Sequence, residues 1–182
     1  MKTEAVRVRR ATADDARAIA EIVVGGWQTA YRGILPDDFL AGLSVGAREV
    51  AWRMRLECED DGSREPIWVA EMAGEAIGFV SCGSPRDEDW KSSRGQVGRL
   101  GGEVYAIYVA PDGWRKGAGR ALLETATSHL RACGSETLVL WVLEANTNGR
   151  EFYEAMGWRP DGTRHLLDLG GFTVPEVRYR RL

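Results

Sequence analysis

The chain has 182 residues, of which 44% are hydrophobic and 28% charged, a composition that excludes a disordered or fibrous protein. A net charge of −3 speaks against a chain-wide affinity for nucleic acid. Cys58, Cys82 and Cys133 are widely spaced and form no CxxC pair, so neither a disulfide scaffold nor a zinc site is expected. Without an apolar signal region or a run of ~18 apolar residues, the sequence predicts one cytoplasmic domain with no metal and no membrane partner.

The first third of the chain has the pattern of one strand followed by three helices. Thr12 suits the N-cap of the first helix, whereas Gly25 and Gly26 weaken that helix near its end. Pro36 suits the start of a short second helix, and Ser44 is a candidate cap for the third. The predicted elements are a strand at 5–12, a helix at 12–27, a short helix from 36 and a helix from 45 to about 59.

The rest of the chain alternates strands with helices. Two apolar runs joined by Ala73, Gly74 and Glu75 indicate a hairpin, and the polar, glycine-rich stretch after it predicts a long loop containing Trp90, a candidate wall or lid of a cleft. The predicted elements are the hairpin at 67–83, the loop at 84–102, a strand at 103–110, a helix in the stretch 117–134 with Gly134 as the residue past its C-cap, a buried strand at 136–144, a short helix at 146–157, and strands at 163–169 and 176–182. This order predicts an α/β or α+β domain with a mixed sheet.

One turn, in the stretch VAPDGWRKGAGRALL at 109–123, has the composition of a phosphate site. A P-loop requires Lys and then Ser or Thr after its last glycine, but Arg120 and Ala121 follow Gly119. A Rossmann fingerprint requires Gly or Ala where this chain has Leu122. What remains is a strand followed by x-x-G-x-G and a helix, whose first backbone N–H groups can bind a phosphate.

Glycines and cations support that reading of the turn. Gly117 and Gly119 have no Cβ atom to hold a phosphate away from the backbone. Arg115, Lys116 and Arg120 supply positive charge at the rim, where arginine binds phosphate through a fork and lysine as a point charge.

Two motifs together resemble the GNAT N-acetyltransferase superfamily. The stretch VYAIYVAPDGWRKGAGRALL resembles its acetyl-CoA motif, and NTNGREFYEAMGW resembles its second motif. Trp114 replaces the Gln or Arg that the family prefers, and Gly149 replaces Ala, which weakens the helix by up to ~1 kcal/mol. The resemblance implies one GNAT-like domain over residues 1–182, with a mixed, mostly antiparallel sheet of six to seven strands flanked by helices and a splayed central strand that binds acyl-CoA. Acceptor-side helices are expected at about 12–60, the acetyl-CoA motif at about 103–132 and the second motif at about 146–158.

The resemblance also implies which residues bind acetyl-CoA as co-substrate. Backbone N–H groups late in the central strand would bind pantetheine and the oxyanion. Asn146 would point toward CoA, although a helix cap alone explains it equally well. The implied cofactor-binding residues are Ile107, Tyr108, Val109, Trp114, Arg115, Lys116, Gly117, Ala118, Gly119, Arg120 and Asn146.

Acetyl transfer to an amine needs a base and an acid, because an alkyl ammonium of pKa about 10.4 cannot attack and a thiolate must leave. By resemblance Glu103 is the general base, acting through water, and Tyr153 is the general acid near the sulfur. The alternatives are an exposed charge at the start of a strand for Glu103 and a core aromatic residue beside Phe152 for Tyr153.

The acceptor side is assigned to the first helices. Trp27, Tyr31 and Arg32 would give it aromatic walls and a charge, although Trp27 and Tyr31 also suit a packing pair at i, i+4. The expected function is transfer of an acetyl group to a primary amine of a small molecule or peptide. The alternative is a CoA-binding regulatory module with little or no turnover. Nucleic acid is not an expected partner, and the acceptor and the oligomeric state, a homodimer included, are left open.

Overall fold

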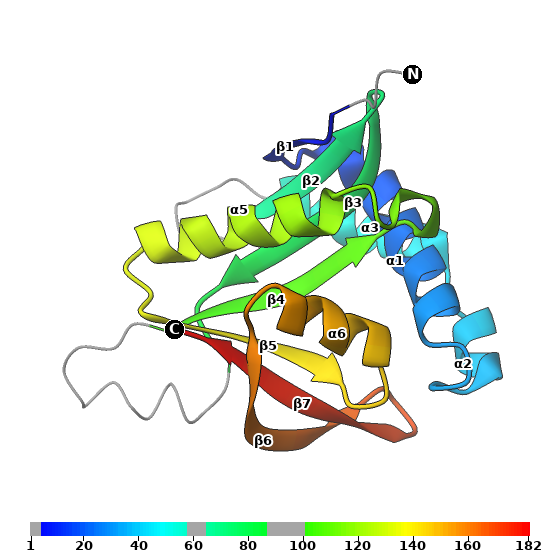
Figure 1. The fold of residues 1–182 in the computed structure, drawn as a ribbon. Coiled ribbons are helices and arrows are strands. Elements are labelled where there is room, and N and C mark those ends of the chain that lie inside the picture. The colour runs from blue at the N-terminus through cyan, green and yellow to red at the C-terminus, as the bar shows by residue number, and fades with distance from the viewer. Residues whose placement is uncertain (1–4, 58–64, 87–100) are drawn as a thin grey trace. The chain divides into compact units, whose positions relative to one another are not determined.

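The computed structural model describes residues 5–57, 65–86 and 101–182 (Figure 1). Seven strands form one sheet in the order β1-β2-β3-β4-β5-β7-β6, which confirms the expected sheet of six to seven strands. The strands are β1 (Arg7–Arg10), β2 (Ile67–Met72), β3 (Glu75–Gly83), β4 (Gly101–Val109), β5 (Thr137–Leu143), β6 (Arg159–Asp168) and β7 (Thr173–Arg181). The helices are α1 (Ala16–Ala30), α2 (Asp37–Ala41), α3 (Val45–Glu57), α5 (Ala118–Ala132) and α6 (Thr147–Ala155), with short 3-10 turns η1 (Ala13–Asp15) and η3 (Pro111–Gly113).

The chain divides into two compact units, one of residues Met1–Cys82 and Ala106–Ala126 and one of Gly83–Tyr105 and Thr127–Leu182. β4 and α5 each contribute to both. Among the described pairings with a defined register, β4 with β5 is parallel and the others are antiparallel, which confirms the mixed, mostly antiparallel sheet.

The core of the first unit lies between α1 and the β2–β3 hairpin. Ile19 of α1 and Val69 and Phe79 of the hairpin are completely buried within one cluster. The expectation that Gly25 and Gly26 weaken the end of α1 did not anticipate that the helix continues to Ala30. Gly26 is buried, and a Cβ atom there would lie 3.5 Å from the ring of Tyr108, an ordinary van der Waals distance, so crowding does not require glycine at this position.

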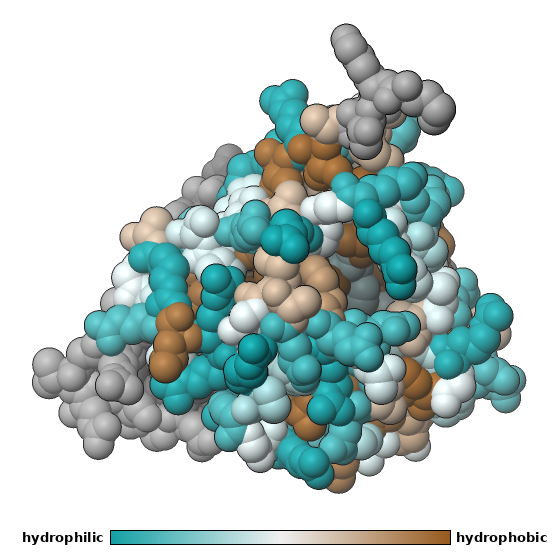
Figure 2. All heavy atoms as spheres, viewed as in Figure 1, coloured by the Kyte–Doolittle hydropathy of each residue, from teal (hydrophilic) through white to brown (hydrophobic). Residues whose placement is uncertain are grey.

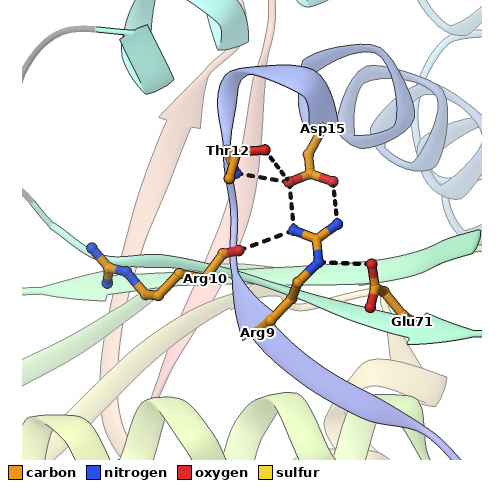
Figure 3. A network of polar contacts seen from close by, with 5 residues as sticks. All are labelled: Arg9, Arg10, Thr12, Asp15 and Glu71. Carbon is orange, nitrogen blue, oxygen red and sulfur yellow. Dashed lines mark hydrogen bonds and ion pairs between the residues drawn. The ribbon is translucent and has the colours of Figure 1, made fainter. Parts of the chain in front are cut away.

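A polar network joins β1, η1 and β2 in the first unit (Figure 3). Arg9 donates from Nη1 and Nη2 to the carboxylate of Asp15 at 2.7 and 2.8 Å, and from Nε to Glu71 at 2.7 Å. Thr12 occupies the expected N-cap position, and its backbone N–H donates to Asp15 at 2.7 Å. Burial raises the pKa of Asp15, but the hydrogen bonds from Arg9 and Thr12 outweigh it and hold that pKa below its ordinary value.

The second unit contains the β4–β5 pairing, β7, β6 and α6. Glu103 of β4 and Arg180 of β7 both pair with Val139, so their side chains share one face of the sheet, whereas Tyr179 pairs with Leu140 and lies on the other. Arg150 of α6 hydrogen-bonds to Tyr179, so α6 covers that other face, as Figure 1 also shows. The face that carries Glu103 is called the Glu103 face below.

The two C-terminal strands are longer than predicted, and the predicted starts at 163 and 176 are wrong. β6 begins at Arg159 and β7 at Thr173. Pro160 and Gly162 interrupt the alternating pattern, but the pairing absorbs them in a register shift between Pro160 and Arg164. Gly162 has φ 88°, a conformation that glycine adopts without strain.

Large exposed hydrophobic side chains are scattered over the described surface. They include Val50 and Met54 on α3 and Leu166 on β6. The face drawn in Figure 2 is mainly hydrophilic, with hydrophobic residues in small separate groups. None of the described helices combines the length and the apolar character that a membrane crossing requires.

Candidate functional site

The predicted phosphate turn lies between the end of β4 and α5, in the first unit. After η3, Arg115 has φ 60° and Gly117 has φ 92°, so the chain turns sharply before α5 begins at Ala118. A Cβ atom at Gly117 would meet nothing within 4 Å, so the space above the turn is open. Positive φ rather than crowding therefore accounts for glycine at this position.

The first residues of α5 carry unpaired backbone donors. Ala121 is the first residue of α5 whose N–H reaches a backbone acceptor, the carbonyl of Gly117 at 3.0 Å. Within the described part of the chain, the N–H groups of Ala118, Gly119 and Arg120 have no such acceptor. The start of a 15-residue helix thus presents free donors and the positive end of its dipole.

The three cations expected at the rim, Arg115, Lys116 and Arg120, are all exposed. Arg120 forms a weak ion pair with Glu124 at 4.0 Å, with both side chains more than half exposed, a pair that contributes little to stability. These side chains are therefore available to an anion at the turn.

Trp114 anchors the turn to β4. Its indole Nε1 donates to the carbonyl of Val109 at 2.8 Å, and 42% of the residue stays exposed. Because this donor is occupied, Trp114 cannot supply the side-chain hydrogen bond of a glutamine or arginine. The backbone groups of the turn and the exposed cations beside it are what remains for an anion.

β4 and β5 are paired over only part of their length. The register covers Gly101–Val104 of β4 and Thr137–Leu140 of β5, and in the described structure no pair joins the strands beyond Val104. The backbone from Tyr105 to Val109 therefore has no partner in β5, which is the splayed central strand that the fold prediction required.

Glu103 of the second unit is 1% exposed. Its carboxylate accepts three hydrogen bonds from Arg86, from the backbone N–H at 2.7 Å, Nε at 3.1 Å and Nη2 at 2.7 Å. The Arg86 guanidinium also lies 4.4 Å from the ring centroid of Tyr105, whose hydroxyl donates to the carbonyl of Ser84 at 2.6 Å. Glu103 is therefore a buried, paired carboxylate and not the exposed strand-start charge that was its alternative.

Sequence reasoning did not find Arg86. It lies 17 residues from Glu103, inside the stretch predicted as a loop. No local pattern marks such a partner, since the contact depends on how the chain returns to β4. Trp90 and residues 87–100 of the predicted loop, together with 58–64, lie outside the described residues.

Tyr153 lies on α6, partly buried, with its ring 5.3 Å from that of Phe152 and 6.2 Å from that of Tyr179. Asn146 caps α6, since its Oδ1 accepts from the N–H of Gly149 at 3.0 Å. The cap prediction for Asn146 is confirmed.

The cap also explains why Gly149 replaces the alanine that the second motif prefers. A Cβ atom there would lie 2.6 Å from Nδ2 of Asn146 and 3.0 Å from its Cγ. Gly149 therefore leaves room for the side chain that caps the helix.

The expected acceptor residues lie at the end of α1 and just after it. Trp27 packs against the core cluster, with its ring 5.3 Å from Tyr31 and 6.1 Å from Phe39, and the guanidinium of Arg48 lies 5.2 Å from it. The packing alternative for Trp27 and Tyr31 thus has direct contacts to support it. Arg32 is exposed.

A second group of polar residues on the Glu103 face was not predicted as a site. His165 of β6 contacts Glu176 of β7 at 3.1 Å, and its ring centroid lies 4.1 Å from that of Trp141 in β5. Arg178 pairs with Asp161 at 2.8 Å. Burial raises the pKa of Glu176, whereas the charges of His165 and Arg86 oppose the rise.

The described residues contain no group of three or more His, Cys, Asp or Glu side chains suited to a metal ion. Cys82 is buried and Cys133 is exposed, and neither forms a disulfide among the described residues; Cys58 lies outside the described residues.

A mixed sheet whose fourth strand leads through a glycine turn into a helix is typical of one class of α/β proteins, and comparisons identify the family. The model of the Acetyltransferase (GNAT) family matches residues 30–158. The chain is 36% identical over 174 residues to the uncharacterized N-acetyltransferase YuaI of Bacillus subtilis, covering 94% of this chain and 90% of that protein.

Solved structures agree on the fold. The PaiA N-acetyltransferase of Thermoplasma acidophilum, in complex with coenzyme A, has a TM-score of 0.70 at 16% identity and covers 95% of this chain and 98% of its own. YncA of Salmonella typhimurium, solved with acetyl-CoA, has a TM-score of 0.66 at 20% identity, covering 97% and 93%. The chain therefore belongs to the GNAT acetyltransferase family, and the predictions of fold class and of N-acetyltransferase as the enzyme class are confirmed.

Proposed function

We propose that the protein transfers an acetyl group from acetyl-CoA to a primary amine of a small molecule or peptide by direct attack. The observation that carries the proposal is the row of free N–H groups at the start of α5, behind Gly117 at φ 92°. That arrangement suits the pyrophosphate of CoA, because backbone donors and the helix dipole act together on an anion. Arg115, Lys116 and Arg120 add exposed positive charge beside it.

The unpaired part of β4 suits the rest of the cofactor. Ile107, Tyr108 and Val109 lie beyond the last residue paired with β5, so their backbone can hydrogen-bond to pantetheine as an added strand would. The same N–H groups are candidates to stabilise the oxyanion that forms when the amine attacks. When bound, acetyl-CoA supplies the acetyl thioester.

The proton transfers are assigned to two side chains of the second unit. As the amine nitrogen bonds to the acetyl carbon and the carbon–sulfur bond breaks, Tyr153 donates its phenolic proton to the departing sulfur. Glu103 accepts the proton that the amine loses, through water. Transfer of that proton through solvent to the Tyr153 phenolate restores both groups, so the net products are an amide and free CoA thiol.

Arg86 shapes the role of Glu103. Three hydrogen bonds, two of them from the Arg86 guanidinium, hold this buried carboxylate in one orientation. Trp27, Tyr31 and Arg32 are proposed for the acceptor side, with Trp27 contributing through packing and the exposed Arg32 through charge.

Thiol release from acetyl-CoA, measured across a panel of small amines and peptides, tests the proposal. Turnover on at least one primary amine is expected, with Tyr153→Phe and Glu103→Gln lowering kcat by about 10²–10⁴-fold as for other acid–base groups. Binding of CoA without product on any amine, and without an effect of Tyr153→Phe, would instead favour the regulatory module.

Two substitutions test the phosphate turn by calorimetric titration with CoA. Gly117→Val is expected to abolish binding, because a β-branched residue does not tolerate φ 92°. Trp114→Gln is expected to retain binding, since the backbone supplies the donors. Loss of binding in Trp114→Gln with retention in Gly117→Val would contradict the assignment.

A further inference from the structure

Tyr179, which the proposed chemistry does not use, lies directly behind the proposed acid. It is a residue of β7 with 0% exposure, and its ring centroid lies 6.2 Å from that of Tyr153 at an interplanar angle of 47°. A buried tyrosine needs partners for its hydroxyl, and those partners identify what this residue does.

The Tyr179 hydroxyl is fully used, and both partners lie on α6. It donates to Oε1 of Glu154 at 2.7 Å and accepts from Nε of Arg150 at 3.1 Å. Arg150 and Glu154 are separated by one helical turn, with Tyr153 immediately before Glu154 in the chain. One hydroxyl therefore fixes two successive turns of α6 to β7.

Arg150 extends this network to the end of β5. Its Nη1 donates to the carbonyl of Glu144 at 3.1 Å. Burial raises the pKa of the Tyr179 phenol, so its proton stays available for Glu154 well above neutral pH. The network thus holds over the pH range in which an acetyl-transfer reaction would run.

α6 depends on tertiary contacts of this kind to fix its rotation. It has nine residues, none of them fully buried, and a helix this short is marginal without tertiary contacts. A tyrosine hydroxyl on such a helix lies roughly 9 Å from the axis, so a rotation of about 10° moves it by roughly 1.5 Å. A misplacement of about 1 Å can lower a rate by about 10²-fold.

We propose that Tyr179 is a positioning residue, which sets the rotation of α6 through Arg150 and Glu154 and thereby aims the Tyr153 hydroxyl at the departing sulfur. The inference rests on the proposed role of Tyr153 and adds the group that makes this role possible. Tyr179 itself transfers no proton in the reaction.

Tyr179→Phe tests the proposal, because it keeps the ring and removes both hydrogen bonds. The expected result is a kcat lowered by about 10–100-fold, with KM for acetyl-CoA changed by less than about twofold. In the double variant Tyr153→Phe/Tyr179→Phe, the second substitution should cause no further loss, because a residue that acts only through Tyr153 has nothing left to position.

Arg131→Met is the matched structural control. Arg131 donates to the carbonyls of Ser135 and Glu136 at the end of α5, so its loss removes two hydrogen bonds from the same unit without touching α6. Its kcat per folded molecule should equal that of the unsubstituted protein. If Tyr179→Phe does not fold, Glu154→Ala removes one of the two contacts and enters the same cycle.

The outcomes separate the two proposals. If Tyr153→Phe slows turnover but Tyr179→Phe does not, or if their effects multiply, positioning by Tyr179 is overturned and the acid role of Tyr153 stands. If Tyr153→Phe itself has no effect on kcat, both proposals fall. A loss in Tyr179→Phe that disappears on the Tyr153→Phe background supports both.

Discussion

Replacing Arg86 by alanine provides a direct measure of the contact that holds Glu103. The substitution removes the hydrogen bonds from Nε and Nη2 to Oε1 and leaves the backbone N–H bond in place. Hydrogen bonds to charged groups are worth about 1.5–3 kcal/mol each. The Arg86 side chain is 61% exposed, whereas that of Glu103 is 1% exposed, so the cost arises on the glutamate side.

We expect Arg86→Ala to lower the free energy of unfolding by about 2–4 kcal/mol, toward the lower end of the cost of breaking a buried pair because water can reach the vacated position. Glu103→Gln should cost less, since its amide oxygen can still accept a hydrogen bond from the exposed guanidinium. The double variant should lose about 1–2 kcal/mol less stability than the two single variants added together, because its buried group no longer carries a charge.

Urea unfolding at neutral pH measures these differences, with Arg164→Ala as the matched control. Arg164 pairs with Glu144 at 2.8 Å, but the two side chains are 68% and 32% exposed, so that loss should stay within about 0.5 kcal/mol. If Arg86→Ala cost no more than Arg164→Ala, or if the two losses were additive, the reasoning about a buried pair at Glu103 would be refuted.

Two further substitutions test the structure away from the reaction. Asp15 has a lowered pKa in the folded state, so it contributes stability that is present above about pH 4 and is lost as the pH falls through the folded pKa. Arg9→Gln should therefore destabilise the protein at neutral pH and flatten the acid dependence of stability in unfolding titrations. An unchanged slope would contradict the network around Asp15. Gly149→Ala should gain up to ~1 kcal/mol of stability from helix propensity and lose about as much because Asn146 is displaced from its cap. A net gain in stability near 1 kcal/mol in thermal unfolding would argue against the cap.

Local chemistry explains which elements could be predicted. Gly134 ends α5 with φ 89°, and Ser44 caps α3 by accepting from the N–H of Ala47 at 3.2 Å, because each of these signals acts within a few residues of itself. The continuation of α1 through Gly26 could not be predicted, since the packing of this helix in the core outweighs the low helix propensity of glycine. The starts of β6 and β7 were placed too late for a related reason, since strand pairing overrode the local proline and glycine signals.

The same distinction between local signals and distant contacts applies to the candidate site. The turn at Gly117 depends on backbone angles that a short motif encodes, so its geometry could be predicted even though Trp114 departs from the family pattern. The surroundings of Glu103 and Tyr153 depend on Arg86 and Tyr179, which are 17 and 26 residues away and carry no local signal.

The different origins of the turn and of the proton-transfer groups have a functional consequence that the proposed experiments can test. If the anion site is built from backbone and the proton-transfer groups are held by distant side chains, cofactor binding and turnover should fail independently. Gly117→Val should then lose CoA binding while retaining the stability contributed by the Arg86–Glu103 pair. Tyr179→Phe should bind CoA with nearly unchanged affinity and turn over slowly. If the Tyr179→Phe variant lost CoA binding in proportion to its activity, α6 would support the cofactor rather than orient the acid. Tyr153 would then have a role in CoA binding in place of the acid role proposed for it.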